Sequence, residues 1–266
     1  MIVSELIPFL QSIDARPKKR LSQNFLIDPN IVRKIVQTAE IQPGDAVLEI
    51  GPGPGALTAA LLDAGAHVFA IEKDPVFAHA LPRLQTTDQR LTIFCDDALE
   101  FPLDRLPAKK VVANLPYHIT TPILERLFAH SFSTLTLMVQ KELAIRLLAQ
   151  SGTKDFSSLT LFAQFYATMQ TSFPVGSGCF YPKPKVDSTV IRLDIQKPQI
   201  SEAEPFFKLV RRAFQQRRKM LSTSLQEMHS SQKIRGALTA LGLRSDARPE
   251  SLSLDQWLLF FNEISG

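Results

Sequence analysis

A glycine-rich turn at residues 51–55 is the feature that most restricts how this chain can fold. It follows an apolar run, Ala46 to Ile50, that is long enough for a short buried strand, and it precedes a helix-like stretch from Ala56 to Leu62. Glycine permits a positive φ and lets a ligand lie against the backbone at the carboxyl end of a strand. The pattern predicts a strand, turn and helix unit that could bind a nucleotide, although a plain strand-to-helix connection can carry the same glycines.

Strand and helix patterns alternate along most of the chain. A helix is expected after Asp28-Pro29, an N-cap followed by proline at the first helical position. This alternation predicts an α/β fold with a mostly parallel, doubly wound sheet and helices on both faces. The expected strands are 46–50, 67–71, 91–95, 110–113 and 135–139, with a last one at 190–193.

Composition sets the class of protein. The chain has 266 residues, of which 45% are apolar, and can therefore bury a large domain and a smaller one. It has no apolar run of the roughly 18 residues that a membrane span requires, and Met1 to Gln11 makes a poor signal peptide. We therefore expect a cytoplasmic protein without membrane contact. Cys95 and Cys179 lack zinc-type spacing, and no metal is expected.

Acidic residues follow two further predicted strands. Glu72 stands 21 residues after Gly51, a spacing that suits a carboxylate binding the two hydroxyls of a ribose. Asp97 could accept a hydrogen bond from an exocyclic adenine amine, or could equally cap a helix. The turn also fits a relaxed dinucleotide fingerprint, Gly51-x-Gly53-x-x-Ala56, so a nicotinamide dehydrogenase is one interpretation.

The fourth predicted strand ends in Asn114-Leu115-Pro116-Tyr117. The N6 amine of adenine is a poor nucleophile, because its lone pair is delocalised into the ring. A side-chain amide oxygen and a neighbouring carbonyl, of Leu115 or Pro116, can accept its two hydrogens, while an aromatic ring stacks on the base. Holding amine and methyl donor in line would then account for much of the rate. A dehydrogenase has no use for this tetrapeptide.

The C-terminal part is the more basic one: residues 201–266 hold 10 basic and 7 acidic side chains. Residues 196–199 resemble a linker, which divides the chain into domains 1–199 and 200–266. A helix is expected to begin at Ser201 and continue over 206–225, with Arg217 on its apolar side, either paired or at a domain seam. Its other side carries a basic stripe within an arc of about 120°, and a basic loop lies near the N-terminus. The cations expected to contact RNA are Lys208, Arg211, Arg212, Arg218 and Lys219 in the stripe and Arg16, Lys18, Lys19 and Arg20 in the loop.

These motifs together resemble the small-subunit (16S) ribosomal RNA adenine dimethyltransferases, the enzymes whose loss gives kasugamycin resistance. The resemblance runs from about Arg16 to Leu225. It is carried by Lys19-Arg-Leu-Ser-Gln-Asn-Phe-Leu26, Val47-Leu-Glu-Ile-Gly-Pro-Gly-Pro-Gly-Ala-Leu-Thr58, Glu72, Asp97-Ala98, Asn114-Leu-Pro-Tyr117, Phe180-Tyr-Pro-Lys-Pro-Lys-Val-Asp-Ser188 and Ala213-Phe-Gln-Gln-Arg-Arg-Lys219.

The resemblance implies a Rossmann-like methyltransferase domain and a small all-α C-terminal domain. It also implies transfer of methyl groups from S-adenosylmethionine to two adjacent adenosines in the 3′-terminal hairpin of 16S rRNA, late in 30S subunit assembly, by a monomer.

Residue roles follow from the same resemblance. Asn24, Leu26 and Gly51 would line the methionine side of the cofactor, with Gly53 in the same turn. Glu72 would hold the ribose and Asp97 the adenine, and Asn114 would lie between cofactor and target amine. Tyr117 would stack on the target base, with Phe180 as the opposite wall, although the residues around Phe180 by themselves indicate only a rigid loop.

Two positions depart from the family pattern: Ser22 replaces the usual glycine and His118 the usual asparagine. Neither removes a principal contact, and we assign His118 no catalytic role. Two other functions remain open at this point. One is a large-subunit rRNA methyltransferase of the macrolide-resistance type, which the stretch from Phe180 to Ser188 disfavours. The other is a subunit-assembly factor with little catalysis.

Overall fold

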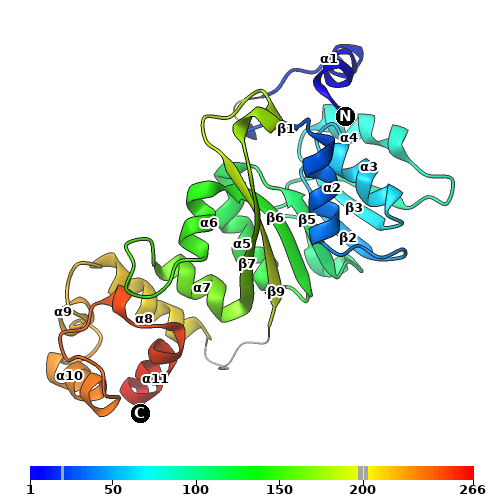
Figure 1. The fold of residues 1–266 in the computed structure, drawn as a ribbon. Coiled ribbons are helices and arrows are strands. Elements are labelled where there is room, and N and C mark those ends of the chain that lie inside the picture. The colour runs from blue at the N-terminus through cyan, green and yellow to red at the C-terminus, as the bar shows by residue number, and fades with distance from the viewer. Residues whose placement is uncertain (19–20, 197–199, 201–202) are drawn as a thin grey trace. The chain divides into compact units, whose positions relative to one another are not determined.

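A computed structural model describes residues 1–18, 21–196, 200 and 203–266 (Figure 1). The chain forms two compact units: Met1–Ala144 with Met169–Ile195, and Ile145–Thr168 with Gln196–Gly266. The second unit therefore includes a segment that lies well before the single boundary expected at residue 199. Phe165 of this segment is in the same buried apolar cluster as Phe206 and Trp257, which explains why the segment belongs to the C-terminal unit.

The first unit is built on a seven-stranded sheet with the strand order β4-β3-β2-β5-β6-β9-β7. Five neighbouring strands are parallel, and β9 runs antiparallel to β6. This confirms the mostly parallel α/β fold. The sheet consists of β2 (Ala46–Ile50), β3 (His67–Glu72), β4 (Leu91–Cys95), β5 (Lys110–Asn114), β6 (Thr134–Gln140), β7 (Ala167–Val175) and β9 (Ser188–Ile195).

All six predicted strands are present, and β7 is the strand of this sheet that the sequence did not predict. Its sequence, Ala-Thr-Met-Gln-Thr-Ser-Phe-Pro-Val, lacks an apolar run because it lies at the edge of the sheet, where several of its side chains are exposed. A separate two-stranded sheet pairs β1 (Phe25–Leu26) with β8 (Phe180–Tyr181).

Helices flank the large sheet, and their starts follow from the sequence. At the start of α2, the Asp28 carboxylate accepts hydrogen bonds from the amides of Asn30 and Ile31, and Pro29 is the first helical residue, as predicted. At the start of α3, Gly55 has φ 83°, and a Cβ there would lie 2.5 Å from a methyl group of Leu84. The helices of this part of the chain are α1 (Val3–Ser12), α2 (Pro29–Thr38), α3 (Ala56–Asp63), α4 (Pro75–Ala80), α5 (Thr120–Phe128) and α6 (Lys141–Leu147).

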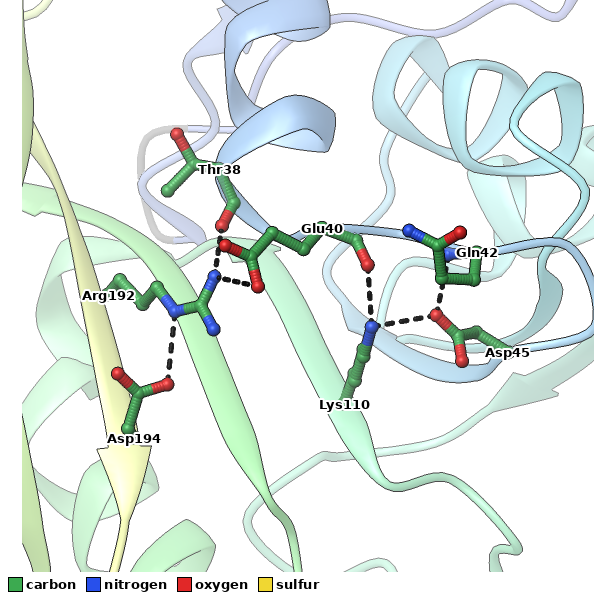
Figure 2. A network of polar contacts seen from close by, with 7 residues as sticks. All are labelled: Thr38, Glu40, Gln42, Asp45, Lys110, Arg192 and Asp194. Carbon is green, nitrogen blue, oxygen red and sulfur yellow. Dashed lines mark hydrogen bonds and ion pairs between the residues drawn. The ribbon is translucent and has the colours of Figure 1, made fainter.

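A polar network joins the amino ends of the parallel strands to the end of α2 (Figure 2). Lys110, the first residue of β5, donates to the Glu40 carbonyl at 2.7 Å and to the Asp45 carboxylate at 2.8 Å. Arg192 of β9 donates to the Thr38 carbonyl at 2.9 Å and pairs with the carboxylates of Glu40 and Asp194 at 2.8 and 3.0 Å. The network therefore links β5, β9 and the residue before β2 to the end of α2, at the end of the sheet opposite to the glycine turn.

The second unit is helical, with Trp257, Phe206 and Phe260 fully buried in its core. Its helices are α7 (Ser158–Tyr166), α8 (Ala203–Gln215), α9 (Leu221–Ser224), α10 (Ser231–Ala240) and α11 (Leu254–Ser265). No helix in the described parts of the chain has the length and apolar character that crossing a bilayer would require.

The prediction of one helix over 206–225 is wrong, because α8 ends at Gln215 and a turn precedes α9. Tertiary contacts hold this turn: Arg217 donates to the Thr153 carbonyl at 3.1 Å and lies 3.9 Å from the Glu250 carboxylate. The Leu221 amide donates to the Ala247 carbonyl at 2.8 Å. The prediction that Arg217 is paired is confirmed. The expected helix start at Ser201 and most of the expected linker lie outside the described residues.

Candidate active site

One cavity opens at the carboxyl ends of the parallel strands. The order of the strands reverses between β2 and β5, and open α/β sheets bind their ligands at such a switch point. The cavity collects the ends of β2, β3, β4 and β5 together with part of the N-terminal segment. The predicted cofactor and target-base residues that line it are Asn24, Leu26, Gly51, Gly53, Glu72, Asp97, Asn114, Leu115, Pro116 and Tyr117.

The glycine turn forms one wall. Gly51 and Gly53 have φ values of 68° and 53°, in the left-handed region that favours glycine. A Cβ on Gly53 would lie 3.2 Å from the Phe25 ring. The Gly53 amide donates to a Glu72 carboxylate oxygen at 2.9 Å, which fixes the turn to the end of β3.

Glu72 is 6% exposed and accepts a second hydrogen bond from the Asp74 amide at 2.8 Å. Burial raises the pKa of this carboxyl group above its usual value, although both amide hydrogen bonds favour the charged form. Each carboxylate oxygen accepts one of these bonds and can accept another. The group can therefore hold the turn and still accept hydrogen bonds from a ligand hydroxyl.

Asp97 lines the same cavity and follows β4. It pairs with Lys73 and accepts a hydrogen bond from the Leu99 amide at 3.0 Å. Partial burial disfavours the charged carboxylate, but these hydrogen bonds together lower the pKa of Asp97. The side chain is thus a charged acceptor that is still partly exposed.

The N-terminal segment contributes more than the sequence suggested. Met1 and Leu6 also line the cavity. Leu6 belongs to α1, and Met1 lies just before this helix. The sequence did not indicate this role, because apolar side chains give no signal for a ligand. Lys18, which is expected to contact RNA, pairs with the buried carboxylate of Asp74 at 2.8 Å, and this carboxylate also accepts from Gln23 at 3.0 Å.

Asn114 ends β5 and points its amide toward the N-terminal segment, where Nδ2 donates to the Asn24 carbonyl at 3.3 Å. The Pro116 carbonyl already accepts hydrogen bonds from the Ile119 amide and the Thr120 hydroxyl, both at 3.1 Å. The Leu115 carbonyl accepts none from the described residues. Of the two carbonyls that the sequence left open, Leu115 is therefore the one available to a ligand.

Tyr117 lies in the turn that follows β5. Its hydroxyl is 2.8 Å from the hydroxyl of Ser188, so that the ring is tethered at its far end. Burial raises the pKa of the phenol above its usual value, which leaves it neutral over the physiological range. The ring can therefore offer a neutral, half-buried face to a flat ligand.

Phe180 is not brought to this cavity. It is 3% exposed, pairs with Leu26 across the short β1–β8 sheet, and belongs to a core cluster that includes Val175 and Val190. The stretch expected to be a rigid loop therefore begins with the short strand β8, and Phe180 is its first residue. A stacking role would require the ring to leave its apolar surroundings.

Ser22 and His118, the two departures from the family pattern, both line the cavity and lie against each other. His118 Nδ1 is 3.0 Å from the Ser22 hydroxyl. The sequence gives no sign of this contact, because the two residues are 96 positions apart in the chain.

The predicted RNA-contacting cations differ in their surroundings. Arg211 pairs with Glu204, and Arg212 with Glu227. Lys19 and Arg20 lie outside the described residues. Within this predicted set, four cations are exposed and make no ion pair with a described residue: Arg16, Lys208, Arg218 and Lys219.

Comparison with known families and relatives gives a consistent result. The family model "Ribosomal RNA adenine dimethylase" matches residues 15–265. A relative from Protochlamydia amoebophila, named "Ribosomal RNA small subunit methyltransferase A", is 48% identical over 98% of this chain and 96% of its own length. A relative of the same name from Chlamydia trachomatis is 46% identical over the same shares.

Two solved structures share the fold. A dimethyladenosine transferase from Plasmodium falciparum has a TM-score of 0.80 and 25% identity, covering 91% of this chain and 98% of that one. The 23S rRNA methyltransferase ErmE has a TM-score of 0.73 and 28% identity, covering 91% of this chain and all of that one.

Proposed function

The chain belongs to the ribosomal RNA adenine dimethylase family, and we propose on that basis that its substrate is the RNA of the small ribosomal subunit. Membership makes it an S-adenosylmethionine-dependent rRNA adenine dimethyltransferase. The observation that carries the proposal is the single cavity in which the glycine turn of β2 meets the Asn114–Tyr117 motif of β5. A nicotinamide dehydrogenase has no use for that motif.

The choice of small-subunit RNA rests on the full-length relatives. Those at 44–48% identity carry the name small subunit methyltransferase A, whereas the large-subunit enzyme ErmE is 28% identical. The fold does not separate the two substrates, because both classes share it. In detail, we propose dimethylation of two adjacent adenosines in the 3′-terminal hairpin of 16S rRNA, late in 30S assembly.

The residues of the cavity suit the cofactor. Asn24, Leu26, Gly51 and Gly53 would hold its methionine side, where the two glycines of the left-handed turn carry no side chain of their own. Two further contacts are proposed at its nucleoside end: Glu72 would accept from the ribose hydroxyls and Asp97 from the adenine amine. The cofactor supplies a methyl group on a sulfonium, which makes that methyl electrophilic.

The protein's own part in the transfer is to position the amine. The Asn114 Oδ1 atom and the Leu115 carbonyl accept the two hydrogens of the adenine N6 amine, which turns its lone pair toward the methyl donor. Once the target base has left its RNA helix or loop, Tyr117 stacks on it. This contact offsets part of the few kcal/mol that unstacking the base costs. Alkylation makes the amine acidic, so that its proton passes to solvent without a strong base.

The remaining properties follow from the same assignment. The unpaired cations Arg16, Lys208, Arg218 and Lys219 would contact RNA phosphates. An enzyme that acts on ribosomal subunits in a bacterium works in the cytoplasm, and we expect it to act as a monomer.

The test is methyl transfer to small ribosomal subunits that lack the dimethyladenosines. The protein is incubated with them and S-adenosylmethionine labelled in the methyl group, and nuclease digestion identifies the product. Label in N6,N6-dimethyladenosine from the 3′-terminal hairpin is the expected result. Label in large-subunit RNA would instead indicate the macrolide-resistance type. Particle binding without label would indicate an assembly factor.

A further inference from the structure

The contact between Ser22 and His118 joins two segments of the cavity wall. Ser22 belongs to the N-terminal loop and His118 to the turn after β5, and their side chains meet at 3.0 Å. Ser22 has φ 50°, a left-handed conformation that serine rarely adopts. The local sequence does not favour this conformation, so contacts with the rest of the protein must hold it.

Hydrogen bonds continue from this contact to the centre of the site. Asn24 Nδ2 donates to the Ser22 carbonyl at 3.0 Å, and Asn114 Nδ2 donates to the Asn24 carbonyl at 3.3 Å. His118 itself follows Asn114, the last residue of β5, by four positions in the chain. The bonds therefore form a closed ring, from His118 through Ser22 and Asn24 to Asn114 and back along the chain.

We propose that Ser22 and His118 are positioning residues that, through Asn24, fix the orientation of the Asn114 carboxamide. This inference rests on the proposed function. A carboxamide has one donor end and one acceptor end. With Nδ2 bound to the Asn24 carbonyl, Oδ1 is the end that can accept a hydrogen from the target amine. In the reversed orientation, Oδ1 would face the Asn24 carbonyl, and two acceptors would oppose each other.

The N-terminal loop does not depend on the contact between Ser22 and His118 for its fold. Gln23 donates to the buried Asp74 carboxylate at 3.0 Å and accepts from the Lys18 amide at 2.8 Å. Removing the contact between Ser22 and His118 should therefore leave the loop in place while loosening the Asn24 carbonyl. We therefore expect the loss of this contact to lower the rate of methyl transfer and to leave folding unchanged.

The experiment measures single-turnover methyl transfer to small subunits at saturating S-adenosylmethionine and subunit, for Ser22→Ala, His118→Ala and the double variant. We expect each single variant to transfer about three- to tenfold more slowly, the range that one modest hydrogen bond supports. The double variant should be no slower than the singles, because both remove the same contact. The affinity for S-adenosylmethionine, from equilibrium dialysis, should stay close to that of the wild type.

Two further variants separate positioning from stability. Ser22→Gly removes the hydroxyl and places a glycine at a positive φ, which glycine adopts without strain. The thermal midpoint of this variant should therefore be unchanged or higher, while its rate of methyl transfer falls. A merely structural role would move both in one direction. His79→Ala, an exposed histidine at the end of α4, is the matched control and should transfer at the wild-type rate.

Several outcomes would overturn the inference. These are unchanged rates in both single variants, additive losses in the double variant, or a rate that falls only in step with the thermal midpoint or with cofactor affinity. A wild-type protein that transfers no methyl to small subunits would overturn the proposed function itself, and the inference with it.

Discussion

Glu49 lies within β2, one residue before the strand's end, and its carboxyl group is inside the protein. It is 1% exposed, and its Oε2 atom has no hydrogen-bond partner among the described residues. Burial, with a smaller contribution from the charge of Glu72, raises the pKa of Glu49 to about 8. The folded protein therefore keeps this group protonated at neutral pH.

This burial predicts a pH dependence of stability. The unfolded chain loses the Glu49 proton near 4.5 and the folded protein near 8, so that stability is highest below this window and falls as pH rises through it. The loss is on the order of a few kcal/mol. The Glu49→Gln side chain carries no charge at any of these pH values. As pH rises between these limits, urea unfolding should show that the free energy of unfolding of the wild type falls relative to that of the variant. Parallel curves for the two proteins would contradict the assignment.

Tyr117 offers a second test at the scale of one residue. Its ring is proposed to stack on the target base, whereas its hydroxyl contacts Ser188. Tyr117→Ala should lower methyl transfer by about five- to 150-fold, since stacking on one base contributes about 1–3 kcal/mol. Tyr117→Phe keeps the ring and should retain most activity. Equilibrium dialysis should find the affinity for S-adenosylmethionine little changed in both, and a matching loss of affinity in Tyr117→Ala would refute this division of roles.

At the scale of the element, the network in Figure 2 holds the end of α2 against the amino end of β5 and the carboxyl half of the antiparallel strand β9. Arg192 has a side chain that is only 15% exposed and binds one carbonyl and two carboxylates. Arg192→Ala should lower the free energy of unfolding by about 1–3 kcal/mol, because charge-assisted hydrogen bonds are lost in a partly buried site. Chemical denaturation measures this change.

The matched control is Arg244→Ala. Arg244 also pairs with a carboxylate, that of Asp246, but its side chain is 83% exposed. Surface pairs of this kind contribute little, so that its removal should change the free energy of unfolding by less than about 1 kcal/mol. Equal losses in the two variants would mean that burial does not set the strength of the network.

The elements themselves were largely predictable. Buried parallel strands have continuous apolar runs, and the start of α2 has its own chemistry in Asp28-Pro29, so that both were visible in the sequence. The edge strand β7 and the end of α8 were not predictable, because the residues at these places carry no local sequence pattern for a strand or a helix end. The partners of Arg217 and Leu221 set the turn after α8, and those partners lie elsewhere in the chain.

At the scale of the whole molecule, we expect binding to ribosomal subunits to depend on salt through the unpaired cations. Lys208→Ala and Arg218→Ala should each weaken binding and lower the slope of log affinity against log salt by about one, since each removes one phosphate contact. Filter binding to small subunits over a range of salt concentrations measures this slope. The side chains of both residues are exposed and make no ion pair with a described residue.

Arg211→Ala is the internal comparison, because Arg211 already pairs with Glu204 at 2.7 Å on the same helix as Lys208. Its slope should change less than that of the unpaired cations. Because α8 ends at Gln215, Arg218 does not continue the helical stripe of Lys208 and Arg211. If all three variants kept the wild-type slope, these cations would have no phosphate contacts and would only form a solvated surface.

The sequence by itself determined the parallel strands, the glycine turn and the identity of the polar residues at the strand ends. These depend on patterns within a few residues, which local propensity and periodicity control. Only the tertiary structure decided the order of the strands, which brings Gly51 and Asn114 to one cavity. It also decided that Phe180 is buried, that Lys18 pairs with Asp74, and that Ser22 meets His118. Such contacts join residues far apart in the chain, and packing of the whole fold selects them.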